Sequence, residues 1–323
     1  YARDIVSEIM DACGPKNVPH PDIVTESGRA LVAHHSVLVF NVLGTNEILA
    51  GQAPELVGAD EHRIIQQLYE TYMNVSRKNF QESYHDALQL KEEAVSAFTL
   101  GVLGLRERAR VEQLFWAVCE RILKIVRDLP YVPDDLEGLE KQLSDTYYCN
   151  FSLFQSMPDH WAVKQLFPTM PIERLDKQPT RRAVLADLTC DSDGKIDEFI
   201  DLRDVKHFLP LHPLNGEPYH IATFLVGAYQ EILGDLHNLF GDTDAVHVKL
   251  TEDGYSVQHV VEGDSITEVL SYVQYSKDDL VARVRRAVEA ALRDKRLTMA
   301  ESGRLMKRFE EGLEGYTYLS SEN

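Results

Sequence analysis

The sequence predicts a mixed α/β protein in which a helical segment, a β-rich segment and a second helical segment follow one another. Apolar residues recur at helical spacing over residues 60–129. Residues 145–275 contain short apolar runs separated by turn residues, which predicts a sandwich or barrel. Residues 277–313 return to helical spacing, with apolar side chains on one face. A chain of 323 residues is long enough to bury a core in two or more domains.

The first fifty residues are expected to form helix, loop, short strand, loop and helix. We place the strand at residues 23–25, a turn at 26–29 and the following helix at 30–43. Gly28 permits a close backbone approach, and a strand-to-helix turn of this kind can bind a phosphate group. Taken alone, however, the segment is better interpreted as an ordinary turn that carries a surface ion pair.

The two long segments that follow differ in character. Residues 60–129 predict a bundle of two to four helices, closed by a loop at Pro130 and Pro133 and without a catalytic motif. In the β-rich segment, Asp253-Gly254 predicts a hairpin turn. The candidate strands are residues 184–185, 207–209, 219–226, 246–250 and 255–261.

Composition narrows the class of protein. The net charge of −19 argues against a nucleic-acid-binding surface, which needs clustered Lys and Arg. It is compatible with a cationic substrate, although a generally acidic protein explains it equally well. No apolar run is long enough to cross a membrane. The four cysteines have no C-x-x-C or zinc spacing, which indicates reduced thiols in a cytoplasmic protein, and Cys119 is expected in a helical core.

The segment 189–194 reads Thr-Cys-Asp-Ser-Asp-Gly and follows a short apolar strand. With Gly194 at the sixth position of a calcium loop, Asp191 and Asp193 are in place, but the first position is Thr and the twelfth is Ile. The bidentate ligand of such a loop is therefore missing. A polar turn is the better interpretation of these residues alone. A thiol among carboxylates would also suit proton transfer beside a cationic substrate.

Several segments, in the expected order, resemble the pyridoxal-phosphate decarboxylases of the alanine-racemase-like fold. The Thr-Cys-Asp-Ser-Asp-Gly segment resembles the version found in biosynthetic arginine decarboxylases. Glu-Ser-Gly-Arg at 26–29 resembles the family's Glu-Pro-Gly-Arg, with Ser27 in place of Pro, and residues 227–229 resemble its Gly-Ala-Tyr. Segments 150–156 and 231–242 are typical of the arginine branch. The resemblance extends over the whole chain.

The resemblance implies a domain organisation. Residues 1–50 would be the C-terminal part of a pyridoxal-phosphate-binding (β/α) barrel, and 51–140 a helical-bundle insertion. Residues 141–275 would form a β-sandwich or Greek-key barrel domain that carries the catalytic Cys, and 276–323 C-terminal helices. The chain is thus expected to be the C-terminal half of such an enzyme. The family's Schiff-base lysine lies upstream, so the chain alone is expected to be inactive.

The resemblance also implies roles for individual residues. Glu26 would pair with the pyridine nitrogen of pyridoxal 5'-phosphate, while Gly28, Arg29 and Tyr229 would hold the phosphate. For Tyr229 the alternative is an aromatic side chain packed at a strand end. Cys190 would protonate the carbon that loses CO2.

Three acids are candidates for binding the substrate. Asp191 and Asp193 would bind the guanidinium group, because a carboxylate can accept two of its N–H donors. Asp159 would be a second substrate-binding acid, and the alternative for Asp159 is a helix N-cap.

The implied reaction is decarboxylation of L-arginine to agmatine and CO2, at the entry to polyamine (putrescine and spermidine) synthesis. The expected assembly is a homo-oligomer, a dimer or dimer of dimers, in which the Cys-bearing loop enters the partner's cofactor site. The resemblance also implies Mg²⁺, for which the sequence indicates no ligands. Neither nucleic acid nor membrane is an expected partner.

Three alternatives remain open on the sequence. One is a related decarboxylase acting on ornithine, diaminopimelate or a carboxylated polyamine. Another is a non-catalytic fragment or regulatory remnant of the same fold. The third is a calcium-binding module.

Overall fold

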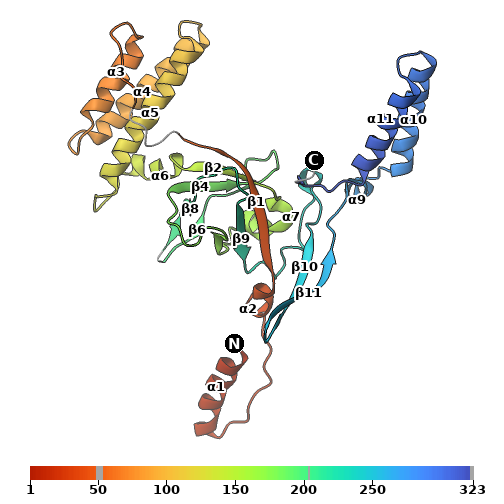
Figure 1. The fold of residues 1–323 in the computed structure, drawn as a ribbon. Helices are drawn as coiled ribbons and strands as arrows, with labels where there is room; N and C mark the ends of the chain where they lie inside the picture. Colours follow the sequence, from red (N-terminus) through yellow and green to blue (C-terminus); the bar gives the residue numbers. More distant parts are fainter. Residues whose placement is uncertain (49–53, 203, 321–323) are drawn as a thin grey trace.

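The structure is a computed structural model that describes residues 1–48, 54–202 and 204–320. It is a mixed α/β molecule built around one central sheet. Figure 1 shows a helical bundle on one side of this sheet, a second group of helices on the opposite side, and the N-terminal helix α1 (Ala2–Cys13) projecting away from both.

The central sheet has seven strands in the order β3-β9-β1-β2-β4-β5, with β8 also paired to β4. The β2–β4 pair is parallel and the other pairs of this sheet are antiparallel. The strands are β1 (Val37–Asn46), β2 (Asp145–Cys149), β3 (Thr169–Pro171), β4 (Arg181–Ala186), β5 (Lys195–Ile196), β8 (Leu209–Leu211) and β9 (His220–Phe224). Strands β6 (Phe199–Ile200) and β7 (Val205–Lys206) pair separately.

The N-terminal part of this sheet corrects the sequence analysis. The predicted helix over residues 30–43 is wrong: helix α2 (Gly28–Val32) and a 3-10 turn are followed by strand β1. β-Branched residues disfavour a helix and favour a strand, and β1 is rich in valine. Phe40 in β1 is buried and stacks on Phe151, with ring centroids 4.3 Å apart. The predicted strand at 23–25 is also wrong, because those residues are exposed and belong to no strand.

Strand β1 pairs with β2 on one side and β9 on the other. Residues 37–46 therefore share a sheet with the β-rich segment that was predicted to begin near residue 141. The predicted boundary between residues 50 and 51 falls on 49–53, outside the described residues. The division into four domains stays a prediction.

The helical bundle consists of α3 (Arg63–Asn74), α4 (Phe80–Thr99) and α5 (Leu105–Val126), followed by the short α6 (Leu139–Gln142). Three long helices agree with the predicted two to four. Their apolar faces enclose a separate core, and Cys119 is buried in it as predicted. Its most buried members include Ile65, Leu68, Ala87, Leu114, Val118 and Ile122.

The C-terminal part begins with the hairpin of β10 (Ala245–Thr251) and β11 (Gly254–Val261), which confirms the predicted turn. Helices α9 (Ile266–Tyr272), α10 (Lys277–Arg293) and α11 (Met299–Leu313) follow. Helices α9 and α11 each start with a capping box, which satisfies N–H groups at their first turns. No described helix is both long and apolar enough to cross a membrane.

Two short helices lie against the central sheet and position the candidate site. They are α7 (Leu153–Ser156) and α8 (Pro158–Val163), directly after β2. Leu153 and Met157 belong to the core of the sheet. Apolar packing therefore anchors helix α7 to the core of the sheet, while polar groups near the ends of the helix remain available for other contacts.

The packing of α5 predicts a contrast between two leucines of this helix. Leu114 is 0% exposed and Leu105 is 74% exposed. Leu114→Ala should lower the free energy of unfolding by about 2–5 kcal/mol, because it removes apolar contacts and leaves a cavity. Leu105→Ala should change it by less than about 0.5 kcal/mol. Urea unfolding of both variants measures this, and equal effects would contradict the packing of the bundle.

Candidate active site

Gly28, Arg29 and Tyr229 come together in the structure although they are far apart in the sequence. A Cβ atom on Gly28 would lie 2.8 Å from the Tyr229 hydroxyl, so the glycine permits this close approach without a shift of the tyrosine. The Arg29 guanidinium lies over the Tyr229 ring, with Cζ 4.8 Å from its centroid. Tyr229 is 48% exposed, so the alternative of a packed strand-end aromatic is wrong.

Asp159 holds the Arg29 side chain. Arg29 Nη2 donates to Asp159 Oδ2 at 2.6 Å, and Gln230 Nε2 donates to the same oxygen at 2.8 Å. The backbone N–H of Asp159 donates to Gln230 Oε1 at 3.2 Å. Asp159 is 7% and Gln230 1% exposed, so these bonds satisfy polar groups that have lost contact with water. Asp159 lies in the first turn of α8, whose N-cap is Met157, and the N-cap alternative is therefore wrong.

Glu26 is not drawn into this cluster. It lies in the loop before α2 and is exposed. The structure thus brings three of the four predicted cofactor residues together with Asp159, and it leaves Glu26 at the surface beside them. Arg29 and the Tyr229 hydroxyl are hydrogen-bond donors of the kind that bind a phosphate group, and Gly28 leaves room for the Tyr229 hydroxyl beside Arg29. The donor set therefore fits the phosphate of pyridoxal 5'-phosphate.

A second cluster surrounds Cys190, which is exposed in the loop after β4. The organising group is the buried carboxylate of Asp187. Its Oδ2 accepts the backbone N–H of Leu153 in α7 at 2.8 Å, and its Oδ1 accepts the N–H and the hydroxyl of Thr189, each at 2.8 Å. Burial raises the pKa of Asp187, and the hydrogen bonds from Leu153 and Thr189 lower it only in part.

The acidic segment after Cys190 forms a tight turn. Asp191 Oδ1 accepts the N–H of Asp193 at 2.9 Å, and the Asp191 carbonyl accepts the N–H of Gly194 at 3.1 Å. These bonds are those of an aspartate-stabilised turn. In the part of the chain that the structure describes, no group of three or more His, Cys, Asp or Glu could hold a metal ion. The Mg²⁺ expected from the resemblance is therefore assigned neither ligands nor a step.

Residues from the connection between β9 and β10 face the Cys190 loop. The backbone N–H of Cys190 donates to Asn238 Oδ1 at 3.0 Å. His237 Nε2 lies 3.9 Å from Asp191 Oδ2, and its ring packs on Phe154 of α7, with centroids 4.5 Å apart. The same connection supplies Tyr229 and Gln230 to the first cluster. Among the described residues, no hydrogen bond, ion pair or ring contact joins the two clusters directly.

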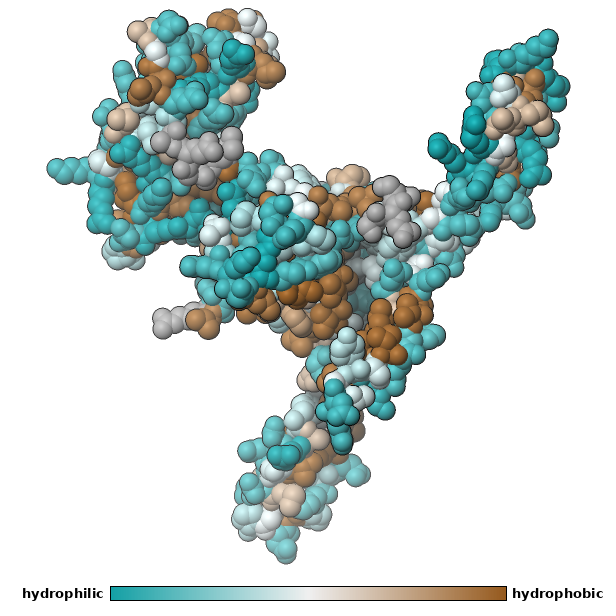
Figure 2. Space-filling view, in the orientation of Figure 1, coloured by the Kyte–Doolittle hydropathy of each residue, from teal (hydrophilic) through white to brown (hydrophobic). Residues whose placement is uncertain are grey.

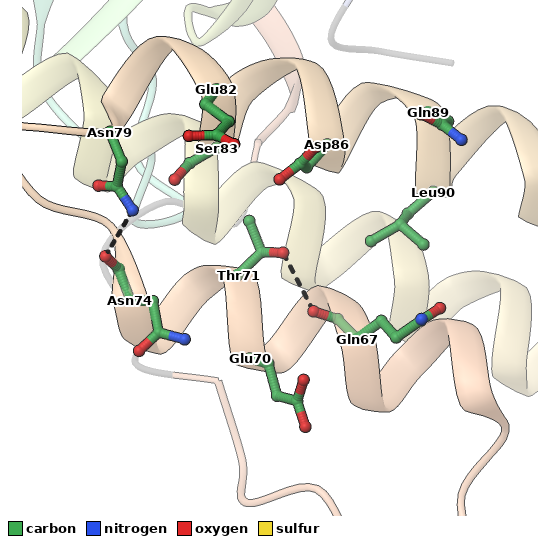
Figure 3. Close-up of a pocket in the computed structure, with 10 residues that line it drawn as sticks. All are labelled: Gln67, Glu70, Thr71, Asn74, Asn79, Glu82, Ser83, Asp86, Gln89 and Leu90. Carbon is green, nitrogen blue, oxygen red and sulfur yellow. Dashed lines mark hydrogen bonds between the residues drawn. The ribbon is translucent and has the colours of Figure 1, made fainter.

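A groove of the helical bundle contains none of these residues. It lies between α3 and α4, and Figure 3 shows polar side chains of both helices around it. The residues that line it are Gln67, Glu70, Thr71, Asn74, Asn79, Glu82, Ser83, Asp86, Gln89 and Leu90. The candidate active site therefore rests on the two clusters beside the central sheet.

Comparison with known proteins shows similarity to arginine decarboxylases. The model of the arginine decarboxylase helical bundle domain matches residues 58–140, and that of the arginine decarboxylase C-terminal helical extension matches residues 266–319. A biosynthetic arginine decarboxylase of Nostoc sp. is 56% identical over 99% of this chain and 47% of its own length. Over almost its whole length the chain is thus similar to one half of a biosynthetic arginine decarboxylase.

Further relatives show the same similarity. The biosynthetic arginine decarboxylase of Thermosynechococcus vestitus is 57% identical over 99% of this chain and 50% of its own length. The crystal structure of the biosynthetic arginine decarboxylase of Campylobacter jejuni is 31% identical, with a TM-score of 0.77, over 99% of this chain and 52% of that one. The chain spans about half the length of the curated relatives it matches.

The sequence analysis missed three buried or partly buried polar residues, Asp187, Gln230 and His237, and the neighbouring Asn238. Asp187 carried a usable signal, because an acid directly after a buried strand sits at a sheet edge where loops meet. Gln230 directly follows the Gly-Ala-Tyr motif, and His237 and Asn238 lie within the segment 231–242, which was noted without a role for either residue. Only contacts between residues far apart in the sequence show which groups these side chains contact.

Gly194 offers a test of the Cys190 loop. A Cβ atom at Gly194 would collide with the carboxylate of Asp187 and the hydroxyl of Thr189, which are fixed by hydrogen bonds. Gly194→Ala should lower the free energy of unfolding by about 1–3 kcal/mol. Gly303→Ala in α11 meets nothing within 4 Å and should raise it by about 0.5–1 kcal/mol, because alanine favours a helix. Thermal unfolding of both variants measures these changes. An unchanged free energy of unfolding in Gly194→Ala would contradict the geometry of this loop.

Proposed function

We propose that this chain is the C-terminal part of a pyridoxal-phosphate-dependent arginine decarboxylase that converts L-arginine to agmatine and CO2 in polyamine biosynthesis. The observation that carries the proposal is the 56% identity, over 99% of the chain, to a relative named biosynthetic arginine decarboxylase. All four cysteines are free, which suits an enzyme of the reducing cytoplasm. The finer assignment of the fold, with the end of a (β/α) barrel joined to a β-domain, is part of this proposal.

The first cluster is proposed to hold the cofactor. Arg29 and the Tyr229 hydroxyl would bind its phosphate, and Glu26 would pair with its ring nitrogen. The chemistry that pyridoxal phosphate supplies when bound is an electron sink for the charge left as CO2 departs. Asp159 fixes the orientation of Arg29 through the bond at 2.6 Å. We assign Asp159 first to this task, and binding of the substrate by its other oxygen remains a prediction.

The second cluster is proposed to act on the substrate. Cys190 Sγ would donate a proton to the carbon from which CO2 has left, and its exposure leaves the thiol accessible. Asp191 and Asp193 would bind the guanidinium group, since a carboxylate accepts two parallel N–H donors from it. Both residues are exposed, so their carboxylates are accessible to a substrate.

The proposed active site forms between two copies of the chain. Among the described residues, no hydrogen bond, ion pair or ring contact joins the two clusters, which supports a site in which Cys190 of one copy enters the Arg29 cluster of another. A large apolar face is available for such an assembly: Figure 2 shows apolar surface around the sheet and the hairpin. On β10 and β11, exposed apolar residues lie directly opposite one another, and such faces commonly mark interfaces. The pairs are Val246–Val260, Val248–Val257 and Leu250–Tyr255.

The reaction is tested by release of labelled CO2 from carboxyl-labelled arginine. This chain would be co-expressed with the N-terminal half of the Nostoc relative, to supply the cofactor-binding lysine, and given pyridoxal phosphate. We expect release only when both halves are present, and about tenfold or more faster from arginine than from ornithine. Absence of release from well-folded halves, or faster release from ornithine, would overturn the proposed reaction.

In this assembled enzyme, Cys190→Ala should lower the rate of agmatine formation about a hundredfold or more, because a positioned proton donor is lost. Misplaced protonation should give some transamination product. Cys13→Ala, at a partly buried thiol of α1, should leave the rate unchanged. Chromatography of the products measures both effects. Equal kinetics of the Cys190 variant and the parent would remove this thiol from the reaction.

A further inference from the structure

The turn His237–Leu239 has an unusual backbone. Asn238 has φ 56° and ψ 20°, and Leu239 has φ 60°, so two consecutive residues other than glycine adopt the left-handed conformation. Asparagine tolerates this region, whereas leucine rarely adopts it. Strain of this kind persists only where the surroundings hold it, and it is often found at functional sites.

Contacts on both sides hold the turn. Leu239 N–H donates to the Leu236 carbonyl at 2.7 Å within the connection itself. On the side of α7, the His237 ring packs on Phe154, and Asp235 N–H donates to the Phe154 carbonyl at 3.0 Å. The turn is therefore fixed to a helix that is itself anchored in the core of the sheet.

The other side of the turn faces the Cys190 loop. Asn238 Oδ1 accepts the backbone N–H of Cys190 at 3.0 Å. His237 Nε2 lies 3.9 Å from Asp191 Oδ2, and this buried nitrogen has no hydrogen-bond partner among the described residues. Thr189 and Asp193 are held by other carboxylates, those of Asp187 and Asp191. Asn238 thus restrains the backbone of the thiol-bearing residue itself.

We propose that Asn238 is a positioning residue for Cys190. Its carboxamide fixes the backbone of Cys190, and this sets where Sγ lies relative to the carbon that receives the proton. The left-handed backbone directs the carboxamide at the loop, so the position requires a residue that tolerates this conformation and carries an acceptor. Asparagine and aspartate meet both needs, while glycine meets only the first. The inference rests on the proposed function of Cys190.

The chemistry of this position supplies a matched pair of variants. Asn238→Gly keeps the backbone conformation and loses the acceptor, and Asn238→Asp keeps both. Because neither adds backbone strain, both variants are expected to fold, which melting temperatures check. In the assembled enzyme, amide hydrogen exchange at Cys190 should be at least about tenfold faster in Asn238→Gly and near the parent rate in Asn238→Asp. Unchanged protection in Asn238→Gly would overturn the proposal.

Kinetics test the consequence for the reaction. Asn238→Gly should lower kcat for arginine about tenfold and raise the share of transamination product, with KM changed less than about twofold. Asn238→Asp should retain the parent kcat and product ratio. Parent-like kinetics of Asn238→Gly, or an equal loss in both variants, would contradict positioning through the acceptor. If the parent enzyme releases no CO2 from arginine, the proposed function is wrong. The amide exchange of Cys190 would still show whether Asn238 restrains the backbone of this residue.

Discussion

A buried carboxylate must find hydrogen-bond donors, and Asp187 meets this constraint by joining two parts of the chain that carry the candidate site. Its two oxygens accept N–H groups of Leu153 in α7 and of Thr189 in the loop after β4. Burial alone would make the charged form costly, and the three donors offset part of this cost. The loop that presents Cys190 is therefore fixed to a helix whose other face packs in the core. The position of the exposed thiol therefore depends on hydrogen bonds of its loop and not on contacts of the sulfur atom itself.

The same principle organises the other cluster, where the buried carboxylate of Asp159 holds Arg29 with help from Gln230. In each cluster a buried carboxylate accepts hydrogen bonds from more than one donor. Each also presents a charged or reactive group, Arg29 or Cys190, toward solvent. The two clusters share the connection between β9 and β10, and among the described residues no hydrogen bond, ion pair or ring contact joins them, as the proposal of two different active sites in a symmetric assembly requires.

Local sequence patterns predicted the helices and turns whose formation depends on residues close together in the sequence. The three bundle helices follow from helical spacing, and the β10–β11 hairpin from Asp253-Gly254. Strand β1 was missed although its valines favour a strand, because its partners β2 and β9 lie far along the chain and no local pattern shows the pairing. The segments that carry Arg29 and Cys190 stood out by resemblance. The contacts that hold them, of Asp159 with Arg29 and of Asn238 with the backbone of Cys190, join residues far apart in the sequence, and no local pattern shows such contacts.

The central claim is that the Arg29 cluster and the Cys190 cluster of one chain serve different active sites. Co-expression of Arg29→Ala and Cys190→Ala chains, each with the N-terminal half and a different affinity tag, tests it directly. If sites are shared, a mixed dimer contains one intact site and one doubly altered site, so random pairing should restore about a quarter of the parent rate of CO2 release from arginine. Purified mixed dimers that remain as inactive as either variant alone would contradict the claim.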